Sequence, residues 1–172
     1  MWRTPCALAG AALLAGGCGS GGQSVEDDKL PYSFEFPSGF QRVSGDNLEA
    51  ATSKTYENET VIAKGDGAEL VSVQTQALRQ SVTPNLLARV EAELESSARE
   101  VGTVERQGSV KVDDRPGFEF RIRYGGRGAK TEALWTYAPK DRTLYWVNCQ
   151  WQKDRQAVLD ACSEVLETLE LK

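Results

Sequence analysis

The sequence predicts an α+β domain: a central antiparallel sheet of about six to seven strands with a helix packed on each face, an α/β/α sandwich. Three observations predict this class. Apolar residues alternate with charged ones over residues 118–124, as in a half-buried strand. Two segments, starting near Thr83 and Asp154, repeat apolar residues at helical spacing. Residues 144–151 are apolar on both faces, and such a strand needs cover on both sides.

The first half of the folded part is predicted to be mostly strand, because apolar runs alternate with turns that contain Gly or Pro. The expected strands are residues 32–36, 40–43, 55–64 and 70–78, with turns at 37–39 and 65–67. The first helix should follow, with Thr83 as N-cap and Pro84 at the first helical position. Gly102 should end this helix, whose apolar stripe is Leu87, Val90, Leu94, Ala98 and Val101.

The second half should add further strands and a final helix that starts after the N-cap Asp154. The expected strands are residues 104–112, 118–124, 131–138 and 144–151, and the helix is 154–170. Because the aromatic residues of 131–138 must share one face, the parity of its pairing is fixed. Glu132 should therefore face Arg121 or Arg123 on the neighbouring strand.

The composition excludes several classes of function. Among 172 residues there are 20 Lys and Arg, 25 Asp and Glu, and no His, which gives a formal charge of −5. An acidic chain binds a phosphate backbone poorly, so nucleic acid is not an expected partner. Without imidazole, a Ser-His-Asp triad and every His-ligated metal site are excluded. We expect no cofactor and no metal ion.

Residues 1–17 are typical of a secretory signal peptide, in which Arg3 precedes an apolar run too short for the roughly 20 residues of a membrane span. The stretch Leu14-Ala15-Gly16-Gly17-Cys18 resembles the lipobox of bacterial lipoproteins, although Leu14 lies one position further from Cys18 than usual. That resemblance implies a diacylglyceryl group, and so palmitate-type acyl chains, on Cys18, with cleavage just before it. The alternative is an ordinary secretion signal that leaves Cys18 or Cys6 as a free thiol.

The sequence divides into three parts. The signal peptide covers 1–17, a flexible lipidated tether rich in Gly, Ser and then acids covers 18–29, and one globular domain covers 30–172. We expect Cys149 and Cys162 to form a structural disulfide, because their spacing matches no common zinc pattern and exported proteins retain disulfides. The expected location is the extracytoplasmic face of the cell membrane, held by the lipid on Cys18.

The chain resembles the PsbP-like lipoproteins of actinobacterial envelopes, the LpqN-type group among them. The resemblance spans about residues 30–172 and depends on three marks: the entry Tyr32-Ser33-Phe34-Glu35-Phe36-Pro37-Ser38-Gly39-Phe40, the turn and strand Asp114-Arg115-Pro116-Gly117-Phe118-Glu119-Phe120, and the Cys149 to Cys162 unit. It implies an α/β/α sandwich and an extrinsic accessory or interaction protein rather than an enzyme. No metal-binding residues are carried over by motif.

Other motifs are explained better by structure than by chemistry. The Gly-rich residues 125–131 lack phosphate-loop spacing and lie between two strands, so they predict a hairpin turn. Asp113 and Asp114 could bind a cation but suit a turn. Trp135, Trp146 and Trp151 could stack on sugars, but core packing is the preferred interpretation because all three lie in strands of a two-sided sheet.

The favoured function is a lipid-anchored, non-enzymatic envelope module that binds a protein or a cell-wall component. Its expected partner surface is the strand face with Glu119, Arg121, Arg123 and Glu132, and the alternative is that this face is merely solvated. A second hypothesis is a carrier or sensor of a small apolar molecule held between helix and sheet. A third is a hydrolase that uses carboxylates or Ser, which would need a cleft with perturbed acids.

Overall fold

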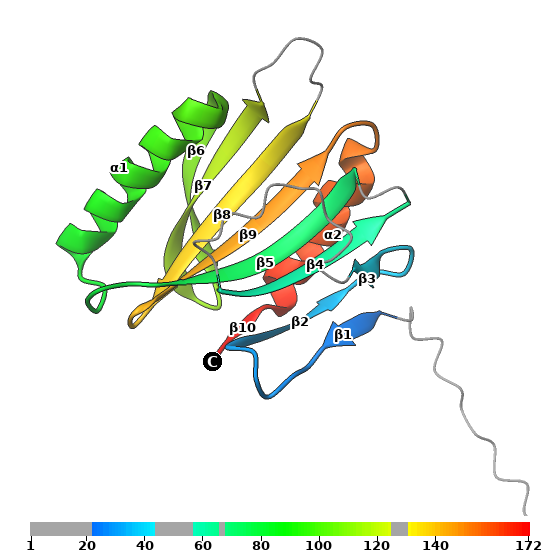
Figure 1. Ribbon diagram of the computed structural model, residues 1–172, viewed down its shortest axis with the longest axis horizontal. Helices are drawn as coiled ribbons and strands as arrows, with labels where there is room; N and C mark the ends of the chain where they lie inside the picture. Colours follow the sequence, from blue (N-terminus) through cyan, green and yellow to red (C-terminus); the bar gives the residue numbers. More distant parts are fainter. Residues whose placement is uncertain (1–21, 44–56, 66–67, 125–130) are drawn as a thin grey trace, which may run out of the picture.

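The computed structural model describes residues 22–43, 57–65, 68–124 and 131–172. Within them, seven strands form one antiparallel sheet in the order β3-β4-β5-β9-β8-β7-β6 (Figure 1). The strands are β3 (Gln41–Val43), β4 (Glu57–Lys64), β5 (Glu69–Ala77), β6 (Gly102–Val112), β7 (Arg115–Tyr124), β8 (Glu132–Lys140) and β9 (Thr143–Trp151). Every predicted strand is confirmed, with bounds shifted by at most a few residues; the predicted turns at 65–67 and 125–128 lie partly or wholly outside the described residues.

A smaller sheet joins the two ends of the described chain. It has the order β1-β2-β10, with β1 at Gln23–Val25, β2 at Tyr32–Phe36 and β10 at Glu170–Leu171. The flexible-tether prediction for 18–29 is therefore wrong for β1, whose Val25 is buried and aligned with Phe34 of β2. The prediction that the last helix continues to Glu170 is also wrong, because Glu170 pairs with Ser33.

The first helix, α1 (Pro84–Val101), begins and ends as its sequence predicts. The Thr83 side chain accepts a hydrogen bond from the backbone N–H of Leu86 at 3.3 Å, and Pro84 occupies the first turn. At the other end, a side chain at Gly102 would lie 2.4 Å from the carbonyl oxygen of Arg123, so the chain can pass from α1 into β6 only with a residue that has no Cβ.

The second helix, α2 (Arg155–Thr168), begins at Asp154, whose side chain accepts from the backbone N–H of Ala157 at 3.2 Å. Its buried residues Val158, Ala161, Cys162 and Val165 join the larger of the two main cores. That core also holds the aromatic side chains of β2 and one face of β5 and β9.

The second main core lies on the opposite face of the sheet. It contains Phe118, Phe120 and Ile122 of β7 and the aromatic residues Trp135 and Tyr137 of β8, and Leu87, Val90, Leu94 and Ala98 of α1 pack on it. The aromatic parity expected for the β7–β8 pair is thereby confirmed.

The fold is mostly sheet. The predicted α/β/α sandwich is wrong because neither helix extends over its whole face of the sheet. A helix is about 10 Å wide and strands lie about 4.8 Å apart, so one helix covers about two strands of a seven-stranded sheet. α1 accordingly packs on β6 and β7 at one edge. α2 covers β5 and β9 and shares that side with β2 (Figure 1).

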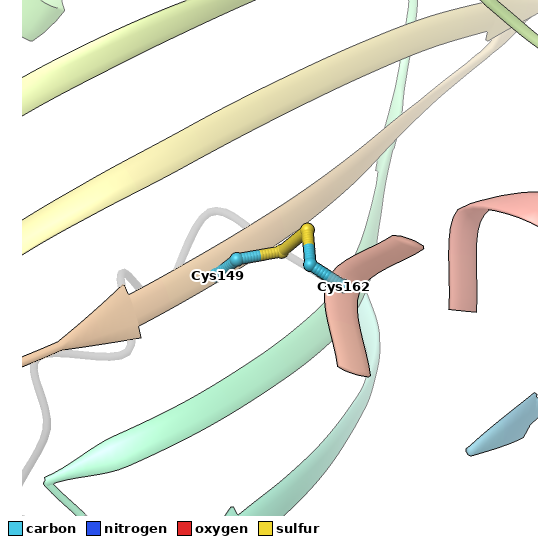
Figure 2. The surroundings of a disulfide bond; sticks show 2 residues. All are labelled: Cys149 and Cys162. Atoms are coloured by element: carbon cyan, nitrogen blue, oxygen red, sulfur yellow. A yellow bond between two sulfur atoms is a disulfide. The ribbon is translucent and has the colours of Figure 1, made fainter. Parts of the chain in front are cut away.

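A disulfide joins Cys149 of β9 to Cys162 of α2, as the sequence predicts (Figure 2). The two Cα atoms are 5.9 Å apart, and both side chains are buried. The bond closes a short loop and fixes α2 on its preceding strand. In the chain-entropy model a loop of this size stabilises the fold by about 3 kcal/mol.

Replacing both cysteines, as Cys149→Ala with Cys162→Ala, should lower the melting temperature by about 10 °C, because about 3 kcal/mol is lost and 1 kcal/mol corresponds to about 2–4 °C at this chain length. Differential scanning calorimetry measures the shift. Ser163→Ala, on the exposed side of α2, is the control. An unchanged melting temperature in the double variant would show that the bond adds nothing to stability.

Tyr32 connects the smaller sheet to the larger one. Its hydroxyl lies 2.9 Å from Oγ1 of Thr60 on β4 and 3.0 Å from the carbonyl oxygen of Val73 on β5. Burial raises the pKa of Tyr32 from 10.0 to about 12, because a phenolate would lose its hydration there.

The raised pKa of Tyr32 predicts a loss of stability in alkali. Below pH 10 the phenol is protonated in both states; above it the unfolded chain ionises while the folded one keeps its proton to about pH 12. The free energy of unfolding should fall over this window by about 2–3 kcal/mol more in the natural protein than in Tyr32→Phe. Urea unfolding at several pH values measures both slopes, and equal slopes would contradict the assignment.

Candidate interaction surfaces

The structure brings the four predicted partner-surface residues together. Glu119, Arg121 and Arg123 project from β7 on the face opposite its buried aromatic side chains, and Glu132 lies on β8 directly opposite Arg123. The prediction that Glu132 faces Arg121 or Arg123 is confirmed for both. Nη2 of Arg121 lies 2.6 Å from Oε2 of Glu132, and Nε of Arg123 lies 4.0 Å from Oε1.

Two further charged residues, which sequence reasoning missed, complete this group. Glu105 of β6 lies 2.6 Å from Nη2 of Arg123 and 3.6 Å from Nε of Arg121. Arg106, also of β6, lies 3.3 Å from Oε1 of Glu119. The pairing of β6 shifts register between Val104 and Arg106, and this bulge places two consecutive residues beside β7. We call these six residues the charge network.

The charge network is electrically balanced, with three acids and three arginines. Ion pairs this close to solvent each stabilise the fold by at most about 1 kcal/mol. The network therefore offers a partner an ordered set of hydrogen-bonding groups rather than a strong field. Such a surface suits selection of a complementary partner better than long-range attraction of an oppositely charged one.

An acidic cleft is the second candidate surface. It has a volume of about 700 Å³ and lies where the smaller sheet, the β6–β7 turn and the end of α2 meet. Six of its lining residues are acids and one is a lysine: Glu26, Glu35, Asp113, Asp114, Glu167, Glu170 and Lys111. A neighbouring hollow of about 620 Å³ shares Glu26, Ser33 and Glu170 and adds Asp27 and Asp28. A concave surface with this charge attracts cationic groups.

Asp113 and Asp114 reach this cleft through the turn that the sequence predicts. Both have positive φ angles, 49° and 57°, as in the tight turns that join antiparallel strands. No local pattern could have found the cleft, because its acids come from segments far apart in the chain.

The three tryptophans of the strands are placed mainly in the cores. Trp135 and Trp151 are 7% and 4% exposed, which supports the core-packing interpretation, whereas Trp146 is half-buried. Arg155 at the start of α2 lies over the Trp151 ring, 5.9 Å from its centroid. Among the described residues, no group of three or more Cys, Asp or Glu is arranged to hold a metal ion. Neither described helix is long and apolar enough to cross a bilayer.

Comparison with known proteins identifies the fold. No family model matches the chain, and no curated protein matches it by sequence. Among solved structures, it is similar to the solution structure of cyanobacterial PsbP (CyanoP) from Synechocystis sp. PCC 6803, with a TM-score of 0.58 and 17% identity over 95% of this chain and 98% of that one. The domain therefore has a PsbP-like fold, as the sequence marks imply.

A second solved structure is a crystal structure from Bacteroides thetaiotaomicron VPI-5482. It matches with a TM-score of 0.56 and 11% identity, over 83% of this chain and 45% of that one. At these identities the likeness concerns the fold alone, and function has to be argued from the surfaces of this chain.

Proposed function

We propose that the protein is a lipid-anchored extracytoplasmic envelope lipoprotein, a non-enzymatic binding or accessory module for a protein or cell-wall partner. The lipobox-like stretch that ends at Cys18 supports the anchor. The PsbP-like fold supports an accessory role, because proteins of that class are typically extrinsic accessory proteins.

The proposal depends mainly on the position of β1, which begins soon after Cys18 in the sequence. Only residues 19–22 separate Cys18 from Gln23, where β1 begins. Five residue steps span about 18 Å at most when fully extended. A diacylglyceryl group on Cys18 would therefore hold the folded domain against the bilayer, with the β1 side nearest to it. Ser24 and Glu26, which line the acidic cleft, lie on that side.

The partner is proposed to contact the charge network around Glu119, Arg121, Arg123 and Glu132. This face lies on β7 and β8, beyond the strands that α2 covers. A small apolar ligand is less favoured, because both described clefts are lined largely by charged and polar residues. Nor do the described acids single out a pair for hydrolysis.

Cys18→Ala should move the protein from the membrane fraction to the soluble extracytoplasmic fraction, because the acyl chains supply the membrane affinity. Fractionation followed by immunoblotting measures this. Cys6→Ala is the matched control, since Cys6 is removed with the predicted signal peptide and its loss should change nothing. Retention of the Cys18→Ala protein in the membrane would refute lipid anchoring.

A photo-crosslinking amino acid at Arg106, whose side chain is 72% exposed beside the charge network, should capture one discrete partner in intact cells. The same group at Arg89 of α1, which is 73% exposed, is the control. Arg123→Glu should abolish the Arg106 product, because it reverses a charge at the centre of the network. Products that are identical at both positions, or unaffected by Arg123→Glu, would argue against this surface.

A further inference from the structure

The sheet face on which α1 packs also carries a band of polar side chains. It lies between the second main core and a small apolar cluster of Val61, Ala63 and Leu70. It consists of Glu59 of β4, Ser72 and Gln74 of β5, and Asn148 of β9, and we call it the polar band. Ser72 lies directly opposite Asn148 in the β5–β9 register, and Gln74 lies opposite Trp146. The opposite face of β5 and β9 holds Val71, Val73, Val147 and Cys149 in the larger core, so the polar side chains of these two strands share one side. Glu59 joins them through a hydrogen bond from Gln74.

Within the part of the chain that the structure describes, two acceptor atoms of the band have no hydrogen-bond partner, namely Oε1 of Gln74 and Oδ1 of Asn148. The two side chains belong to residues that are only 4% and 9% exposed, so water does not hydrate them freely. Nearly all buried polar atoms of native proteins are paired, and an unpaired acceptor costs free energy. Two such acceptors on adjacent strands indicate that a donor from outside the described chain completes the band.

The amide nitrogen of Gln74 already has an acceptor, so the atom of Gln74 that lacks a partner is its oxygen. Its Nε2 donates to Oε1 of Glu59 and lies 3.4 Å from Oγ of Ser72. Gln74 therefore presents its carbonyl oxygen to the site. Burial raises the pKa of Glu59, because its carboxylate is poorly hydrated there. No basic side chain of the described residues forms an ion pair with Glu59.

Aromatic rings border the band. Trp146 lies across from Gln74 and Trp135 across from Asn148. The two indoles meet edge to face, with centroids 5.2 Å apart. Glu59 and Trp146 are half-buried, so the band has a margin open to the surface. The site thus combines amide acceptors, one carboxylate and electron-rich rings.

We propose that the polar band binds an ammonium group, carried by a lysine side chain of a peptide or by a free aliphatic amine. An ammonium has three donors and no acceptor, which matches Gln74, Asn148 and Glu59. Its charge offsets that of Glu59. A neutral saccharide hydroxyl would leave Glu59 without a counter-charge. This proposal does not depend on lipid anchoring.

The test is a titration of the full chain, purified in detergent, followed by NMR of the side-chain amide and indole N–H groups. The probes are butylammonium, the neutral control 1-butanol, Nα-acetyl-lysine methylamide as a peptide lysine, and 1,4-diaminobutane as a free diamine. Saturable shifts at the Gln74 and Asn148 amides with the ammonium probes, and none with 1-butanol, are expected. Tighter binding of the acetyl-lysine probe would identify a peptide source, and tighter binding of the diamine a free amine.

Variants locate the site. Gln74→Met and Asn148→Leu each remove one acceptor at similar volume and should weaken binding about tenfold or more. Gln76→Met, two residues along on the same strand face, should leave affinity unchanged, and thermal melts confirm that each variant folds. Equal binding of 1-butanol, no saturation up to about 10 mM ammonium, binding of N-acetylglucosamine instead, or unchanged affinity in both acceptor variants would overturn the proposal.

Discussion

The position of β9 at the centre of the larger sheet is the constraint on which the structure depends. β9 pairs with β5 on one side and β8 on the other, and both of its faces contribute to cores. Its Cys149 holds α2 covalently. Its Tyr145 hydroxyl lies 3.1 Å from the carbonyl oxygens of both Pro31 and Lys172. One strand therefore fixes the second helix, the residue before β2 and Lys172 at the far side of β10.

This arrangement links the fold to the proposed anchor. The smaller sheet is tied to β9 through Tyr145, and β1, which begins five residues after Cys18 in the sequence, contributes Val25 to the larger core. A lipid on Cys18 would then orient the domain rather than only tether it, with the acidic cleft near the bilayer. The charge network lies on β6, β7 and β8, so the domain offers distinct surfaces for separate contacts.

Much of the fold could be predicted from local patterns, because alternation and capping act over a few residues. Phe118 to Tyr124, Thr83 with Pro84, and Asp154 are such cases, and the parity of β8 even predicted the Glu132 contacts. β1 and β10 are too short for a periodic signal. The β6 bulge that places Glu105 beside β7 has no recognisable local sequence pattern. The acidic cleft and the polar band depend on which distant strands become neighbours, and a strand buried on both faces does not reveal which of its polar residues lacks a partner.

The central claim is that a crosslinked, water-facing domain is held at a membrane by acyl chains on its first mature residue. Intact-mass and peptide mass spectrometry of the protein isolated from its native membrane tests this most directly. The account predicts an amino-terminal peptide that starts at Cys18 and carries the mass of a diacylglyceryl group. An amino terminus at another residue, or an unmodified Cys18, would contradict it.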